Sequence, residues 1–106
     1  MADDTKELLD LRGEIDALDS ELLRLINMRA QLAAEIGKVK RQGNDNATFY
    51  RPEREAMVLR RVLEQNPGPL SGLESTRLMR EIMSACLAFE QQLNIAYLGP
   101  EGTYTQ

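Results

Sequence analysis

The chain has 106 residues, of which 42% are hydrophobic and 28% are charged, and its net charge is −4. These values predict one soluble folded domain with a modest core, and they argue against a disordered chain and against nucleic acid as a general partner. Because no apolar run resembles a membrane span or a signal peptide, and the single cysteine, Cys86, fits a reducing compartment, we expect no membrane association and a cytoplasmic location.

The stretch from Asp4 to Gln42 predicts one very long helix that begins near Asp3 or Asp4 and ends around residues 41–43. Its apolar residues recur in steps of three and four, as in a helix packed lengthwise on other helices: Leu8, Leu11, Ile15, Leu18, Leu22, Leu25, Leu32, Ile36 and Val39. Such a helix is about 58 Å long, whereas a compact domain of this size has a radius of gyration of about 13 Å. A second chain would have to cover the exposed seam, so the pattern predicts an oligomer, with a plain coiled coil as the simplest alternative.

Two further helices are expected after a loop that ends at Arg51. Pro52 suits the first position of a helix that runs to about Gln65 and stops at the turn residues 66–69. Ser71 and Glu74 then fit a capping box that opens a third helix, which continues to about Gln92. Residues 95–98 have a strand-like composition and precede a turn-rich tail. The predicted fold class is all-α, a three-helix subunit with one very long first helix.

Four charged residues occupy positions where these helices should be apolar. Arg29 takes a seam position of the first helix, and Lys40 lies about 20° around and about 16 Å along the axis from it. Glu55 and Glu90 share the apolar faces of the second and third helices. Any one of them alone could be a snorkelling or salt-bridged side chain. Together they predict a site for a small anion, because buried charges are costly unless they are paired or used.

Arg12 precedes Arg29 by about 25 Å along the same helix, so one copy cannot grip a small molecule with both. In an antiparallel pair of chains, Arg12 of one chain can approach Arg29 of the other, although a surface arginine is the simpler interpretation. The chain has no histidine, no metal-ligand cluster and no glycine-rich phosphate loop. We therefore expect neither metal chemistry nor nucleophilic catalysis.

The spaced motifs of the chain resemble the all-helical chorismate mutase family. The resemblance covers residues 5–106 and is carried by LRGEIDALD (11–19), NMR (27–29), IGKVK (36–40), RE (54–55) and IMSACLAFEQ (82–91). The tail IAYLGPEGTYTQ (95–106) is similar to the opening of a prephenate dehydratase domain. The resemblance thus implies the mutase portion of a bifunctional chorismate mutase–prephenate dehydratase, with a mutase domain at 1–93 and the start of a truncated dehydratase domain at 94–106.

This resemblance implies an intertwined homodimer with two shared active sites, which rearranges chorismate to prephenate without a cofactor. It assigns catalytic roles to Lys40, Glu90 and Arg29, and substrate-binding roles to Arg12, Arg29, Lys40, Arg51, Arg54, Glu55, Cys86 and Glu90. Arg29 and Arg12 of the partner subunit would bind the carboxylates, and Lys40, with Glu90 beside it, would act on the ether oxygen. Glu55 would hold the ring hydroxyl, in a region that Arg54 also lines.

The chain departs from one version of the family at three site positions. An aspartate in the loop is replaced by Arg51, a serine by Cys86, which is a weaker hydrogen-bond partner, and a glutamine by Glu90, as in some other members. Two other functions remain open at this point. The chain could be a helical dimerisation or regulatory module for an enzyme that follows Leu93, or it could use the same fold for lyase chemistry on isochorismate.

Overall fold

The computed structural model describes residues 5–42 and 51–98, and three helices occupy nearly all of them. Helix α1 spans Lys6–Gln42, α2 spans Pro52–Gln65 and α3 spans Gly72–Leu98. Within these two ranges the chain forms no strand, so the predicted all-α fold with one very long first helix is confirmed. Residues 43–50, which include all of the expected loop except Arg51, and the tail beyond Leu98 lie outside the described residues.

Helix α1 begins two residues later than the sequence pattern suggested. The side-chain oxygen of Thr5 accepts a hydrogen bond from the backbone N–H of Leu8 at 3.2 Å, and its carbonyl accepts one from Leu9 at 3.0 Å. Thr5 is therefore the N-cap, and Lys6 is the first helical residue. The end at Gln42 agrees with the prediction.

Helix α2 has the boundaries that its sequence predicts. Arg51 is extended, with φ −127° and ψ 97°, as a residue before proline prefers, and Pro52 opens the helix. After Gln65, the side chain of Asn66 closes the turn into α3. Its amide donates to the carbonyl of Leu70 at 2.7 Å and its oxygen accepts from the Ser75 hydroxyl at 3.0 Å.

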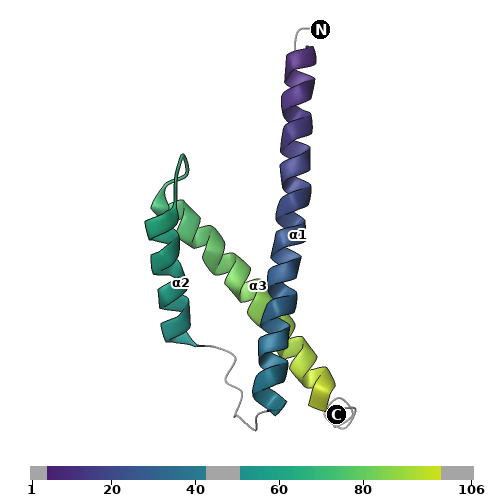
Figure 1. Cartoon of the computed structure of the whole chain (residues 1–106), viewed down its shortest axis with the longest axis vertical. Helices are drawn as coiled ribbons and strands as arrows, with labels where there is room; N and C mark the ends of the chain where they lie inside the picture. Colours follow the sequence, from purple (N-terminus) through teal and green to yellow (C-terminus); the bar gives the residue numbers. More distant parts are fainter. Residues whose placement is uncertain (1–4, 43–50, 99–106) are drawn as a thin grey trace, which may run out of the picture.

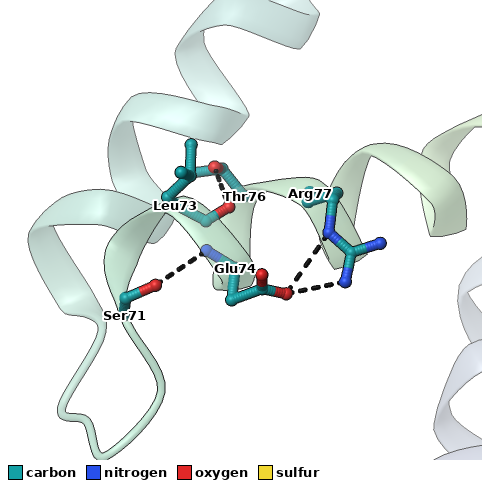
Figure 2. A network of polar contacts seen from close by, with 5 residues as sticks. All are labelled: Ser71, Leu73, Glu74, Thr76 and Arg77. Carbon is teal, nitrogen blue, oxygen red and sulfur yellow. Dashed lines mark hydrogen bonds and ion pairs between the residues drawn. The ribbon is translucent and has the colours of Figure 1, made fainter.

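Helix α3 starts with the expected serine cap. The Ser71 hydroxyl oxygen accepts a hydrogen bond from the Glu74 backbone N–H at 3.1 Å (Figure 2). The Glu74 carboxylate does not complete the predicted capping box but accepts a hydrogen bond from Arg77, at 2.6 Å from Nη2. One half of the box is therefore present, and an ion pair within the helix replaces the other half.

The prediction of a short strand over residues 95–98 is wrong, because α3 continues without a break to Leu98. Extending an existing helix adds a hydrogen bond for each residue fixed, whereas a short strand needs a partner strand to pair with. Contact with α1 also supports this end of the helix, since Arg41 Nη1 lies 3.5 Å from Asn94 Oδ1. The helix crosses the proposed domain boundary after Leu93, and the division into two domains stays a prediction.

Helix α3 connects the other two helices of the chain. It runs diagonally behind α1 and packs against both other helices, whereas α1 and α2 do not approach one another within the described ranges (Figure 1). The subunit extends over 61 × 33 × 23 Å with a radius of gyration of 19.1 Å, against about 13 Å for a compact domain of this length. The chain is therefore extended rather than compact.

The N-terminal half of α1 projects beyond the other helices (Figure 1). Its seam residues Leu11, Ile15, Leu18 and Leu22 are between 50% and 63% exposed. Among the described hydrophobic residues, only Val58 and Cys86 are buried. Much apolar surface thus stays uncovered within one copy of the chain. No helix in the described ranges is long and apolar enough to cross a membrane.

Candidate active site

All three helices contribute to the wall of one cavity of about 590 Å³. This volume is typical of pockets that bind small molecules. Seven of the eight residues assigned to the site from sequence line it: Arg29, Lys40, Arg51, Arg54, Glu55, Cys86 and Glu90. Four of these side chains are cationic and two are acidic, so the cavity has the charge excess that a small anion needs.

Helix α1 supplies Arg29 and Lys40 at the two ends of one face. Both are partly buried, and the cavity wall between them includes Ile36 and the buried Gly37. The spacing of the two cations is about 16 Å along the helix axis, which leaves room for a small molecule between two long side chains.

Helix α2 presents its N-terminal turn to the cavity. Arg51 precedes the helix, Arg54 lies in its first turn and the half-buried Glu55 follows. Below Glu55 on the same face, Val58 is buried, as the spacing of apolar residues predicted. The Glu55 carboxylate also faces α3, where Arg80 Nε lies 3.9 Å from its Oε2.

Helix α3 supplies Cys86 and Glu90 one turn apart. Cys86 is a free thiol that is only 3% exposed. Burial raises the pKa of Glu90 above its ordinary value, although the positive charges of Lys40, Arg29 and Arg41 act in the opposite direction. Glu90 is therefore protonated over a wider pH range than an ordinary glutamate, and in that form its carboxyl group can donate a hydrogen bond.

Arg12 is the predicted site residue that does not line the cavity of its own chain. It lies on the projecting half of α1, about 25 Å from Arg29 along the helix axis. Within one copy, the two arginines cannot contact the same small molecule.

Sequence reasoning missed several residues of this site. Ser84 lines the cavity, and its offset of three from Leu87, which also lines it, could have indicated this position. Arg80 contacts Glu55 from another helix, and Arg41 acts on Glu90 from another helix. Contacts between helices of this kind leave no periodic signal in a sequence. Among the described residues, no group of three or more acidic, cysteine or histidine side chains could hold a metal ion.

Known proteins resemble this chain in sequence and in fold. The chain matches the family model for chorismate mutase type II over residues 11–91. It is 55% identical over 106 residues to a bifunctional chorismate mutase/prephenate dehydratase of Pseudomonas aeruginosa, covering 97% of this chain and 29% of that protein. It is 54% identical over 99 residues to the protein of the same name from Neisseria gonorrhoeae, covering 93% and 26%. The chain thus spans less than a third of the length of these curated relatives.

Two solved structures have the same fold. Form II of chorismate mutase from Thermus thermophilus superposes with a TM-score of 0.74 and 33% identity, covering 80% of this chain and 94% of that chain. Chorismate mutase from Helicobacter pylori, in complex with prephenate, superposes with a TM-score of 0.74 and 31% identity, covering 83% and 93%. The family match, the sequence relatives and the fold agree, and the chain belongs to the type II chorismate mutase family.

Proposed function

We propose that this chain catalyses the rearrangement of chorismate to prephenate in the biosynthesis of phenylalanine and other aromatic amino acids. The observation that carries the proposal is the cavity in which cations from α1 and α2 face two carboxyl groups, on a chain of this family. Chorismate is a dianion with a ring hydroxyl and an enolpyruvyl ether. In the reaction the ether carbon–oxygen bond breaks while a carbon–carbon bond forms, so no atom enters or leaves.

The first task of the site is to hold the substrate in its compact conformer. Arg29 binds one carboxylate, since a guanidinium matches a carboxylate with two parallel hydrogen bonds. Arg54 and Arg51 add positive charge from the start of α2, and Glu55 accepts a hydrogen bond from the ring hydroxyl. Fixing the two reacting carbons near one another removes much of the entropic part of the barrier.

The second task is to stabilise charge on the ether oxygen as its bond breaks. The Lys40 ammonium donates a hydrogen bond to this oxygen, and Glu90 donates a second one when it is protonated. Both donors are held by helices before the reaction starts, so little reorganisation is needed in the transition state. Because bonds change only within the substrate, the mechanism needs no cofactor and no covalent intermediate.

The working form in this proposal is a homodimer with shared sites. A second copy would cover the exposed seam of α1, which a stable subunit cannot leave in water over such a length. An antiparallel arrangement brings Arg12 of the partner subunit toward Arg29, where it binds the second carboxylate. We place the enzyme in the cytoplasm, where Cys86 remains a free thiol.

The curated relatives named above are bifunctional, and their names include a prephenate dehydratase. On this basis, residues 1–93 constitute the mutase domain and residues 94–106 the start of a dehydratase domain. The mutase activity resides in the first of these segments, which contains every residue of the candidate site.

The test is to mix the purified protein with chorismate and, in a parallel assay, with isochorismate, to follow the loss of ultraviolet absorbance, to identify the product, and to determine the oligomeric state of the protein. Formation of prephenate supports the proposal. A protein that dimerises but leaves chorismate unchanged would be a helical interaction module, and one that releases pyruvate from isochorismate would be a lyase. Either of these results would overturn the proposal.

A further inference from the structure

We infer that Arg80 of α3 is a positioning residue for the site: it holds the Glu55 carboxylate in the orientation that accepts the ring hydroxyl of the substrate. The inference rests on the proposed function and extends it to a residue outside the cavity wall. Neither the spacing of motifs nor the resemblance to the family pointed to Arg80.

Arg80 lies within ion-pair distance of Glu55 on a neighbouring helix. Arg80 Nε lies 3.9 Å from Glu55 Oε2, and the pair joins α3 to the first turns of α2. Glu55 lines the cavity with a side chain that is 25% exposed, whereas the Arg80 side chain is 59% exposed and lies outside the cavity lining. Arg80 thus contacts the carboxylate from a position outside the cavity lining.

The ion pair joins α2 to the helix on which it packs. Within the described ranges α2 packs on α3 and not on α1. Glu55 lies in the first turn of α2, and its carboxylate reaches Arg80 on α3. A cation on α3 fixes the carboxylate relative to Cys86 and Glu90, which lie on the same helix as Arg80.

The chemistry is compatible with two partners for one carboxylate. An ionised glutamate has two oxygens and about four acceptor positions, so an ion pair at Oε2 leaves capacity for a hydroxyl donor. The ring hydroxyl does not change its charge during the rearrangement. An interaction with it is equally strong in the bound substrate and in the transition state, and its loss therefore raises KM and leaves kcat unchanged.

A second pair on the same helix provides a matched control. Arg77 binds Glu74 three residues before it, its side chain is 62% exposed, and neither residue lines the cavity. Arg77→Gln and Arg80→Gln therefore remove the same chemical group, at similar exposure, from the same helix. Only the second removes a partner of a cavity residue.

The experiment measures kcat and KM for chorismate in the full chain. Its variants are Arg80→Gln, Arg80→Lys, Arg77→Gln, Glu55→Gln and the double variant Glu55→Gln/Arg80→Gln. We expect Arg80→Gln to raise KM about twofold to fivefold, in the upper part of the range measured for exposed ion pairs, with kcat unchanged. Arg80→Lys should stay close to the unchanged protein, because the lysine ammonium can reach the same carboxylate. Arg77→Gln should have no effect.

The double variant shows whether the effect of Arg80 on KM depends on Glu55. If Arg80 acts through Glu55, Arg80→Gln adds no further rise in KM once Glu55→Gln is present. An equal rise in both backgrounds would overturn the inference, and so would an effect of Arg80→Gln no larger than that of Arg77→Gln. An unchanged protein that neither binds nor converts chorismate would overturn the proposed function itself, and the two failures are therefore distinguishable.

Discussion

Lys40 on α1 and Glu90 on α3 line the same cavity, and the positive charge of Lys40 acts on the carboxyl group of Glu90. Burial raises the pKa of Glu90, and the ammonium of Lys40 is the strongest of the nearby charges that oppose this rise. Burial is the larger influence, so Glu90 keeps its proton to a higher pH than an ordinary glutamate does. When Glu90 is protonated, it and Lys40 offer two hydrogen-bond donors to a single oxygen atom of a substrate.

Activity should therefore decline as the pH rises through the pKa of Glu90. Because this pKa is raised, the donating form persists above the range of an ordinary glutamate and is lost only at higher pH. Glu90→Gln has a similar shape and donates at every pH, so it should flatten the decline. The measurement is kcat/KM against pH at fixed ionic strength, with Glu64→Gln, an exposed position on α2, as the control. Superimposable profiles for the unchanged protein and Glu90→Gln would show that Glu90 does not donate to the reacting oxygen.

Removing the Lys40 ammonium should have a larger effect than replacing Glu90 by glutamine. Lys40→Ala should lower kcat by a factor that corresponds to about 3–4 kcal/mol, since the cation acts on charge that develops in the transition state. Lys38→Ala is the control, because Lys38 is exposed on the same helix and lies outside the cavity. Steady-state kinetics separate the two roles of Lys40. A rise in KM without a loss of kcat would make it a substrate-binding residue only.

The exposed seam of α1 predicts how the subunit assembles. Leu18 is 63% exposed in one copy, and a partner helix would bury it. Leu18→Glu would then place an unpaired carboxylate in that interface, at a cost on the order of several kcal/mol, and should dissociate the dimer. Leu73 is 79% exposed at the start of α3, away from the seam, so Leu73→Glu should leave the dimer intact. Sedimentation equilibrium on both variants checks the prediction, and a stable Leu18→Glu dimer would contradict it.

Most of the fold could be predicted from the sequence because the helices are long and amphipathic. The steps of three and four along α1 recur often enough to identify a helix, and Pro52 marks the start of α2. The ends of the helices were harder to predict. Several capping residues stand side by side at the N-terminus, and only the structure shows that Thr5 forms the cap. The short apolar run at 95–98 has no period of its own, so its preceding helix decides its conformation.

The sequence predicted those residues of the candidate site that helical periodicity places on a particular face of a helix. Glu55 and Glu90 stood out because a charged residue replaced an expected apolar one, and the structure brings both to the cavity. The pairing of Glu55 with Arg80 could not be inferred, since it depends on how α2 and α3 cross. The direction of the Glu90 pKa shift was equally inaccessible, because it depends on how much burial outweighs three nearby charges.

The shared site predicts that two inactive proteins can restore one another. Arg29 lines the cavity and Arg12 lies about 25 Å away on the same helix, so a site that needs both must take them from two chains. Arg12→Ala and Arg29→Ala homodimers should each be nearly inactive. A heterodimer of the two has one site that lacks both arginines and one site that retains both, so it should recover about half of the activity per dimer.

The matched control combines both substitutions in one chain. In a heterodimer of Arg12→Ala/Arg29→Ala with the unchanged chain, each site lacks one arginine, so no site is intact and activity should stay low. If each chain instead formed its own site, this control would retain about half of the activity and the mixture of single variants would recover none. Differently tagged chains allow heterodimers to be isolated before the assay. The two arrangements thus predict opposite results for the same pair of experiments, and an inactive heterodimer of the single variants would exclude the shared site.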